Sequence, residues 1–260
     1  MAIVTLTTDL GTKDFYAASL KGKIYSLCPN VTIVDITHEI PPFDTGIAAF
    51  SLKNTYHDFP EGSIHIIGVD PVEKEDQKHV VVFHDGHYFI SADNGVFSFL
   101  FDKTPQQVLK IKPSNTSLTT TFPAKDIFAT VAAHLASGKE LNEVTSGSHI
   151  IVDRNSIIPT LESNTIIGHA IYIDSMGNIT TDITKDTFVQ MGMGRTFEIG
   201  FRRPDNSIRK ISSYYNQVPK GEKLALFNNC NNLEIAINEG SAAKLFGMKR
   251  GDVIRVNFTD

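Results

Sequence analysis

Three aspartates follow apolar, strand-like segments of this sequence, and their carboxylates are the groups best placed to do chemistry. Asp9 follows "VTLTT", Asp70 follows "HIIGV" and Asp93 lies in "ISADNG". In open α/β sheets, ligands bind at the carboxyl ends of the strands. A carboxylate there accepts hydrogen bonds from hydroxyl groups or pairs with a cation. The three positions therefore predict that acids converge on a small polar ligand.

Each aspartate also has an ordinary structural interpretation. Asp9 precedes a helical pattern and is a candidate helix cap. Asp70 begins an Asp-Pro turn, and Asp93 begins an Asp-Asn-Gly turn. The sequence contains no GxGxxG, P-loop, HExxH or GxSxG motif, so no common phosphate, zinc or serine-hydrolase signature favours one interpretation over the other.

The histidines do not form a metal-binding pattern. His38, His65 and His134 lie in segments that are expected to be ordered, and none has a second ligand at the spacing that a zinc site uses. We interpret them as structural residues and predict no metal.

The elements that must position the acids have α/β character in the first part of the chain. Short runs rich in Val and Ile alternate with helical patterns. After Asp9, one helical face is predicted from apolar residues at a 3.6-residue period, which are Ala17, Leu20, Ile24 and Leu27. Further helices are predicted at 44–53 and 126–137. Residues 1–155 are therefore expected to form an α/β domain with a mostly parallel sheet and flanking helices.

The pattern changes after residue 164. The polar, proline-containing segment 153–164 is typical of a linker. Strand-like runs separated by turns follow it to the end of the chain. Residues 165–260 are therefore expected to form a small all-β barrel.

Composition excludes several classes of partner. The net charge is −5 over 260 residues, and no basic stripe supports nucleic-acid binding. No apolar run approaches the roughly 20 residues that span a bilayer, and the N-terminus lacks a signal-peptide pattern. Cys28 and Cys230 suit reduced thiols. A cytoplasmic protein with no membrane partner is expected.

Several blocks together resemble the S-adenosylmethionine hydroxide adenosyltransferases, relatives of the fluorinase and chlorinase. They are "TTDLGTKDFYAASLKGKIYSLCPNVTIVDITHEIPPFD", "GVDP", "ADNGVFS", "DIFATVAAHLA", "IDSMGNITTDI" and "NLEIAINEGSAAKLFGMKRGD". The resemblance implies an N-terminal α/β domain, a C-terminal β-barrel and a homotrimer. It also implies that S-adenosylmethionine binds between two subunits as substrate or ligand, with no metal and no further cofactor.

The resemblance assigns roles to individual side chains. Asp9 matches an acid that binds both ribose hydroxyls, and Asp14 and Asp174 match acids that hold the methionine ammonium. Asn178 matches an amide that recognises the adenine edge. Two further positions match residues that line the ribose and the adenine, although both also fit a plain core: Phe43 and Met176.

The implied reaction is in-line attack of water or hydroxide at C5′, which expels methionine as a neutral thioether. Family hydrolases position the water with an Asp-Arg-His set. Here Asp70 keeps the acid, but Gln77 stands at the arginine position and Pro123 at the histidine position. Neighbours that would supply a positive charge instead are Lys78, His79 and Lys125.

Three functions follow from this altered set. A slow hydrolase that forms adenosine is the first expectation. A non-catalytic protein that binds S-adenosylmethionine or adenosine is the alternative, and a halogenase-like use of another nucleophile is a further one. The fluorinase carries Tyr where this chain has Asp70, and it has an insertion that the run "HVVVFHDGHYF" lacks. An acid beside the nucleophile also repels a halide.

Overall fold

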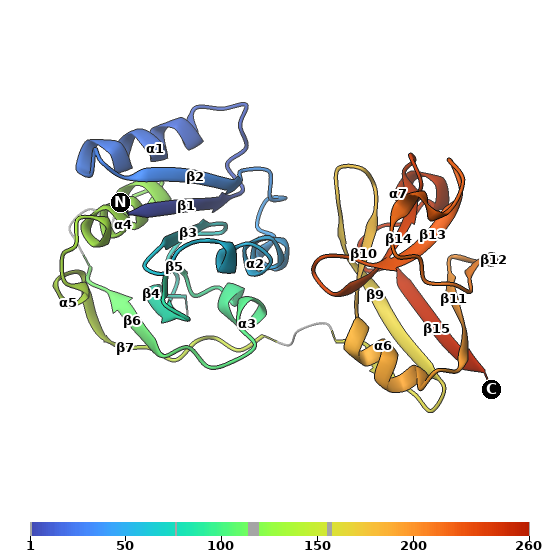
Figure 1. Ribbon diagram of the computed structural model, residues 1–260. Coiled ribbons are helices and arrows are strands. Elements are labelled where there is room, and N and C mark those ends of the chain that lie inside the picture. Colours follow the sequence, from blue (N-terminus) through green and yellow to red (C-terminus); the bar gives the residue numbers. More distant parts are fainter. Residues whose placement is uncertain (1, 76, 114–119, 155–157, 260) are drawn as a thin grey trace. The chain divides into compact units, whose positions relative to one another are not determined.

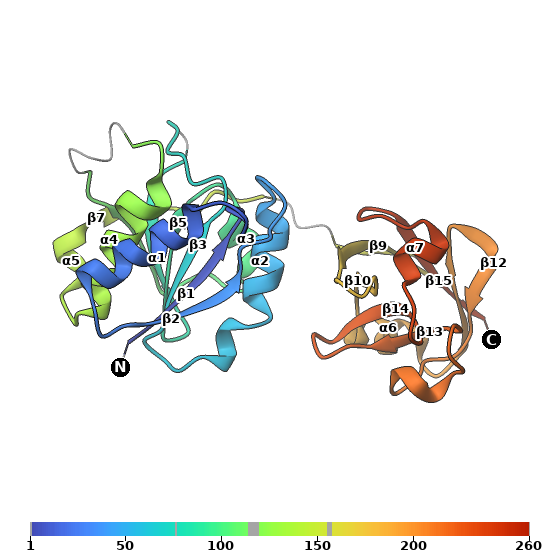
Figure 2. The same cartoon turned by 90° about the horizontal axis from the view of Figure 1, so that it is seen from above.

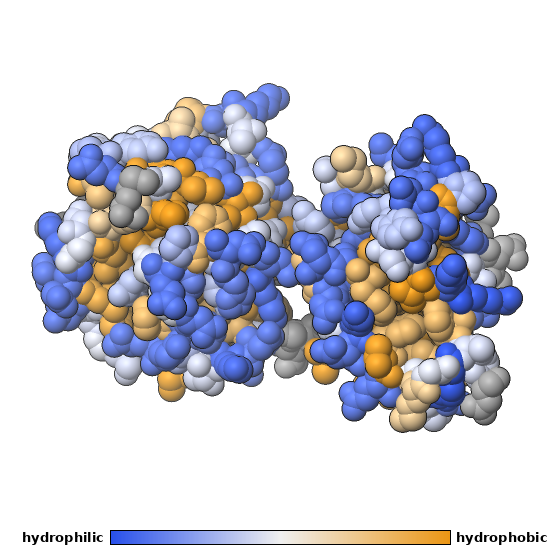
Figure 3. Space-filling view, viewed as in Figure 1, coloured by the Kyte–Doolittle hydropathy of each residue, from blue (hydrophilic) through white to orange (hydrophobic). Residues whose placement is uncertain are grey.

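The computed structural model describes residues 2–75, 77–113, 120–154 and 158–259. The chain divides into two compact units, residues 1–156 and 157–260, and each is described by itself. Figure 1 colours them from blue to green and from yellow to red. Hydrophilic and hydrophobic residues are interspersed on the face of each unit that Figure 3 shows. None of the described helices is long and apolar enough to cross a membrane.

The N-terminal unit alternates strands and helices along its length. Its strands are β1 (Ile3–Thr8), β2 (Thr32–Thr37), β3 (Ile64–Gly68), β4 (His79–His84), β5 (His87–Ala92), β6 (Gln107–Ile111) and β7 (Thr145–Ser148). Its helices are α1 (Tyr16–Leu27), α2 (Thr45–Lys53), η1 (Tyr56–Asp58), α3 (Val96–Leu100), η2 (Ala124–Phe128), α4 (Ala129–Ala136) and α5 (Leu141–Val144).

The strands form one seven-stranded sheet in the order β2-β1-β3-β5-β4-β6-β7. The pairs β1–β2, β1–β3 and β3–β5 are parallel. The pairs β4–β5, β4–β6 and β6–β7 are antiparallel. The prediction of a mostly parallel sheet is therefore corrected to a mixed sheet. The physical reason is the short turn between β4 and β5, which can only join antiparallel strands.

Helices cover both faces of this sheet. α1 contacts α4 on one face, and α2 contacts α3 on the other, as Figure 2 shows from above. Ala17, Leu20 and Ile24 of α1 are buried, as their spacing predicts. Leu27 is 44% exposed, because it is the last residue of α1, where the helix leaves the sheet.

The predicted helix at 126–137 begins earlier and is not regular. Its first turn is the π-helix η2, and α4 continues it to Ala136. Ala124 of η2 lies close to the ends of β1 and β3. The approach is so close that a Cβ added at Gly68 would lie 3.2 Å from both Ala124 Cβ and Thr8 Cγ2. η2 therefore begins at the carboxyl ends of β1 and β3, and π-turns often mark functional sites.

The C-terminal unit is a curled antiparallel sheet around one core. Its strands are β8 (Thr160–Leu161), β9 (Thr165–Ile173), β10 (Ile179–Thr184), β11 (Thr196–Phe201), β12 (Arg203–Ile208), β13 (Lys223–Phe227), β14 (Asn232–Ile237) and β15 (Val253–Thr259). The strand order is β12-β11-β15-β9-β10-β14-β13, with β8 on β9. Its helices are α6 (Lys185–Gly192), η3 (Tyr215–Gln217) and α7 (Ala242–Phe246).

Curling brings the two ends of this sheet together. Ile211, after β12, forms a parallel bridge with Ala225 of β13. One core, which includes Ile166, Ile235 and Val256, fills the interior. The all-β prediction is confirmed as a curled, half-barrel antiparallel sheet.

The predicted linker at 153–164 is only partly irregular. Thr160 and Leu161 form β8 and pair with β9. Residues 155–157 lie outside the described residues.

Candidate functional site at the carboxyl ends of β1 and β3

Two of the three aspartates lie at the ends of neighbouring parallel strands. Thr8, the last residue of β1, pairs with Gly68, the last residue of β3. Asp9 directly follows Thr8, and Asp70 lies two residues after Gly68. Burial is the main cause that raises the pKa of Asp9, and both the backbone N–H and the negative charge of Asp70 act on it, so the two residues are neighbours. The predicted convergence of Asp9 and Asp70 is thus present in the N-terminal unit.

Asp9 is not a helix cap. Helix α1 begins at Tyr16, and its N-cap residue, Phe15, makes no side-chain capping bond. Instead, Asp9 Oδ2 accepts a hydrogen bond from the backbone N–H of Phe43 at 3.0 Å. Phe43 has a positive φ of 65°, and its side chain is 73% exposed.

Burial is the main cause that raises the pKa of Asp9 above its usual value. The backbone N–H groups of Phe43, Asp9 and Asp70 oppose this rise, and the negative charge of Asp70 adds a smaller increase. A carboxylate offers about four acceptor sites, so Asp9 retains acceptor capacity for a ligand beside these donors.

Side-chain hydrogen bonds hold the backbone of Asp70 in place. Its φ is +41°, in the left-handed region that Asp tolerates better than most residues. Its carbonyl oxygen accepts from Asn94 Nδ2 at 3.1 Å and from Gln77 Nε2 at 3.0 Å. Its carboxylate Oδ2 accepts from Lys74 Nζ at 3.1 Å. The side chain of Asp70 is therefore presented by a fixed backbone and paired with a lysine.

Gln77 and Pro123, at the family arginine and histidine positions, both stabilise the local backbone. Gln77 is 5% exposed, and its amide donates to the carbonyls of both Asp70 and Val72. Pro123 is buried and is the N-cap residue of η2, with a φ of −57°. Proline suits this position because its ring fixes such a φ.

The three helper residues predicted beside Asp70 have other partners. Lys78 Nζ lies 3.5 Å from Glu73 Oε1, and Lys125 Nζ lies 3.4 Å from Asp126 Oδ1. His79 bonds the carbonyl of Pro71 at 2.8 Å through Nε2, and burial lowers its pKa. The cation on Asp70 is Lys74, which sequence reasoning missed. Its only sequence signal is the four-residue spacing from Asp70.

Asp14 lies in the exposed loop between β1 and α1. A group of aromatic rings follows Asp14. Phe15 stacks on Tyr16 at 4.3 Å between centroids, and Tyr16 meets Phe122 edge-on at 5.5 Å. Phe122 precedes Pro123, so this aromatic group continues toward the start of η2.

Asp174, Met176 and Asn178 occupy the turn between β9 and β10 in the C-terminal unit. Asp174 Oδ1 accepts from the Asn178 backbone N–H at 2.8 Å, and Oδ2 accepts from Asn178 Nδ2 at 2.9 Å. Met176, at the tip, is 72% exposed. The turn therefore fixes the Asn178 amide against Asp174.

A buried acid that the sequence did not single out lies on β14. Glu234 is 5% exposed and accepts from the Tyr215 hydroxyl at 2.8 Å and from Asn228 Nδ2 at 3.0 Å. Burial and the nearby Glu234 raise the pKa of Tyr215, and Asp174 contributes to the same shift. The Tyr215 hydroxyl is therefore bound to Glu234, and the charge of Asp174 in the β9–β10 turn acts on it.

The comparisons with known proteins agree in both units. Residues 4–145 match the SAM hydroxide adenosyltransferase N-terminal domain, and residues 168–255 match the C-terminal domain of that family. The chain belongs to this family. Among the described residues, no group of three or more His, Cys, Asp or Glu side chains is placed to hold a metal ion.

Relatives in the hydroxide adenosyltransferase family match over most of the chain. A protein of Methanocaldococcus jannaschii named (R)-S-adenosyl-L-methionine hydrolase is 30% identical over 98% of this chain and 95% of its own length. A fluorinase of an Actinoplanes species is 26% identical over 74% of this chain and 75% of its own. A solved structure of a conserved protein from Thermotoga maritima has a TM-score of 0.85 and 28% identity, and the match covers 99% of this chain and 100% of that one.

The third aspartate is committed to other partners and does not join Asp9 and Asp70 as the sequence predicted. Asp93 is buried, and its Oδ2 accepts from His149 Nε2 at 2.7 Å and from the Val152 N–H at 2.8 Å. It therefore anchors the segment after β7, which a turn interpretation does not predict.

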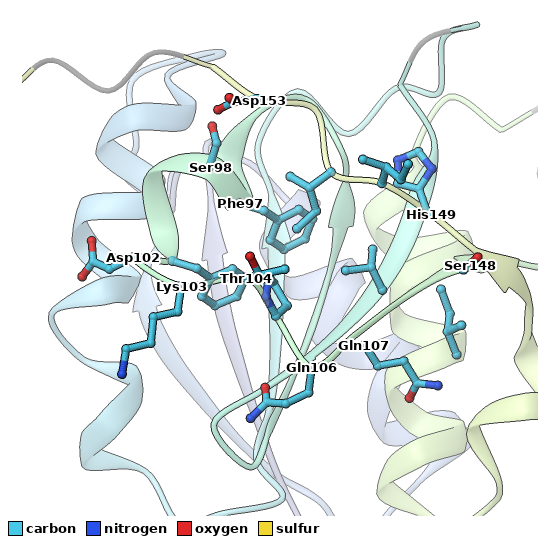
Figure 4. Close-up of a pocket in the computed structure, with 16 residues that line it drawn as sticks. Phe97, Ser98, Asp102, Lys103, Thr104, Gln106, Gln107, Ser148, His149 and Asp153 are labelled. Carbon is cyan, nitrogen blue, oxygen red and sulfur yellow. The ribbon is translucent and has the colours of Figure 1, made fainter.

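A cavity of about 620 Å³ lies beside that segment. Figure 4 shows it between the end of α3, the loop into β6 and residues 148–153, with His149 on its lining. Asp9 and Asp70 are not among its lining residues, so this cavity and the two carboxylates are separate features of the N-terminal unit.

Proposed function

We propose that this chain hydrolyses S-adenosylmethionine to adenosine and methionine. The observation that carries the proposal is the placement of Asp9 and Asp70 just after the paired ends of β1 and β3 in a member of the hydroxide adenosyltransferase family. Full-length relatives named (R)-S-adenosyl-L-methionine hydrolase support the same reaction. Their name specifies the (R) sulfonium, so this epimer is the preferred substrate to test.

The reaction joins a water oxygen to C5′ of the ribose as the C5′–S bond breaks. The electron pair of that bond returns to sulfur, so the sulfonium leaves as the neutral thioether of methionine. The water proton passes to Asp70 and then to solvent, and the oxygen becomes the 5′-hydroxyl of adenosine. No general acid is needed, because the leaving group is neutral. Catalysis then depends on orienting the water and on a dry site.

The remaining residues have binding roles in this proposal. Asp9 accepts hydrogen bonds from the two ribose hydroxyls, and its partly buried position supports that role. Asp14 and Asp174 hold the methionine ammonium. The Asn178 amide recognises the adenine edge. Its bond to Asp174 supports this role, because the bond fixes the orientation of the amide. The exposed side chains of two residues would cover the ribose and the adenine: Phe43 and Met176.

The active assembly in this proposal is a homotrimer. Asp9 and Asp14 lie in one compact unit, and Asp174 and Asn178 lie in the other. A ring of three heterologous contacts would complete each site with residues from two subunits. The proposed protein works in the cytoplasm without nucleic acid, and no metal or other cofactor takes part.

A non-catalytic binding protein is the second candidate. The observation that favours it is Gln77, whose buried amide is committed to two backbone carbonyls at a position where family hydrolases carry arginine. Use of a halide is disfavoured, because Asp70 would repel an anion beside C5′.

Chromatography with calorimetry separates these functions. Purified protein is incubated with each sulfonium epimer, with and without added chloride or fluoride, and adenosine, methionine and halogenated nucleoside are quantified. The proposal predicts equal amounts of adenosine and methionine and no halogenated product. Tight binding without adenosine above the uncatalysed background would instead support the binding protein.

A further inference from the structure

Lys74 and Gln77, in the segment after β3, are joined by two backbone hydrogen bonds. The backbone N–H of Lys74 donates to the Gln77 carbonyl at 3.0 Å, and the N–H of Gln77 donates to the Lys74 carbonyl at 3.2 Å. The buried Gln77 amide then donates to the carbonyls of Asp70 and Val72. These bonds fix the backbone of Lys74 relative to the backbone of Asp70.

This loop brings a positive charge to Asp70. Lys74 Nζ lies 3.1 Å from Asp70 Oδ2, and the side chain of Asp70 is 23% exposed. The neighbouring lysine, Lys78, is directed to Glu73 instead. Among the described residues, Lys74 is the cation that forms an ion pair with Asp70.

We propose that Lys74 is a positioning residue for hydrolysis, acting through Asp70. The inference rests on the proposed function. By donating to Oδ2, Lys74 fixes the rotation of the carboxylate, so that Oδ1 receives the hydrogen bond of the attacking water. Gln77 shapes the loop, and Lys74 supplies the charge, so the two tasks are divided between two residues of one loop.

The nearby charges agree with this role. The pKa of Asp9 is raised mainly by burial, and the negative charge of Asp70 makes a small further contribution. The Lys74 ammonium offsets part of the negative charge of Asp70. Since the substrate carries a sulfonium cation, a nearby ammonium does not strengthen substrate binding. The signature of Lys74 is therefore a change in kcat without weaker binding.

Three substitutions separate charge from structure. Lys74→Ala removes the side chain, Lys74→Gln keeps a neutral donor, and Lys74→Arg keeps the charge. We expect Lys74→Ala and Lys74→Gln to lower kcat about 10- to 100-fold, with substrate Kd within about twofold of the parent value. Lys74→Arg should keep most of the parent kcat. Lys53→Gln, which breaks an exposed Lys–Asp pair with Asp102, is the matched control and should leave kcat unchanged.

The outcomes distinguish this inference from the proposed function. Parent protein that forms no adenosine overturns both. Active parent protein with unchanged kcat in Lys74→Gln overturns the role of Lys74 alone. A fall in kcat that Lys74→Arg fails to restore, or one accompanied by an equal loss of affinity or a lower melting temperature, also contradicts it, because a loop defect would then explain the fall.

Discussion

The carboxylate of Asp9 bonds the backbone N–H of Phe43, which lies 34 residues further along the chain. This bond ties the loop after β1 to the segment that leads into α2. It gives Asp9 a structural partner without using its full acceptor capacity. Changes at Asp9 therefore separate ligand binding from folding.

Asp9→Asn should weaken adenosine binding about 10- to 100-fold, because a neutral amide replaces a charge-assisted acceptor of two hydroxyls. Folding should not suffer. Since burial raises the pKa of Asp9, ionised Asp9 disfavours the folded state as pH rises through that pKa, and asparagine removes this cost. Calorimetry and thermal melting at pH 7 measure both effects. Asp58→Asn, at an exposed residue of η1, is the control, and unchanged affinity in Asp9→Asn would refute the ribose role.

Asp70→Asn should abolish turnover while ligand affinity stays within about twofold. The substitution preserves the backbone bonds from Asn94 and Gln77, and asparagine tolerates the positive φ of +41° at this position. Turnover, calorimetry and melting on the same preparation form the measurement. Equal turnover in parent and variant would show that another group orients the water.

Gln77→Ala should lower the free energy of unfolding by about 1–3 kcal/mol, because the Val72 carbonyl loses its donor and the Asp70 carbonyl keeps only Asn94. Turnover should fall as well, because Asp70 loses one of the two bonds that hold its carbonyl. Thermal melting and turnover measure the two effects. Gln106→Ala, at a residue whose Oε1 accepts from the Asp85 N–H on a separate loop, serves as the comparison. A Gln77→Ala protein as stable and active as the parent would contradict the anchoring role.

Acid should destabilise the N-terminal unit through buried histidines. Burial, with the neighbouring His87, lowers the pKa of His65 to about 3 from an ordinary 6.5. The unfolded chain therefore takes up a proton below about pH 6.5, while folded His65 stays neutral until near pH 3, so stability falls as pH decreases between these values. The total effect is on the order of a few kcal/mol.

His65→Gln keeps a partner for Thr5, which bonds His65 at 2.7 Å, but it removes the titration. Melting temperatures between pH 7 and pH 4 should fall less steeply in this variant than in the parent. His134→Gln, on α4, should retain the parent slope. Identical slopes in the parent and in His65→Gln would contradict the assignment.

Assembly is testable by sedimentation. Because the acids of the proposed site lie in two separate compact units, we expect a trimer at micromolar concentration, with or without S-adenosylmethionine. A monomer under both conditions would remove the basis for sites shared between subunits.

The sequence predicted the elements whose periodicity is local. The buried residues of α1 follow from their spacing, and α2 (Thr45–Lys53) lies within the predicted 44–53, where Asp44 caps it through the Ile47 N–H. The antiparallel half of the first sheet was not predicted, although the short turn between β4 and β5 is a local signal for part of it. The pairs β4–β6 and β6–β7 depend on contacts far apart in the sequence. The π-turn at Ala124, which lies close to Gly68, was also missed, because the sequence carries no local signal for it.

The candidate site was likewise predictable only where its signal is local in the sequence. Asp9 and Asp70 stand at strand ends, and this local signal placed them together. Lys74 carries no such signal, because its approach to Asp70 depends on how Gln77 folds the loop. Asp93 resembled a turn residue, but a histidine 56 residues away occupies its carboxylate.

The central claim is that water attacks C5′ of S-adenosylmethionine in a site that contains Asp70. The most direct measurement is the reaction in ¹⁸O-labelled water, with mass spectrometry of the adenosine product. We predict one solvent oxygen in the 5′-hydroxyl, an equal amount of methionine, and loss of this labelled product in Asp70→Asn. Adenosine without the label, or no adenosine above the rate in protein-free buffer, would contradict the claim.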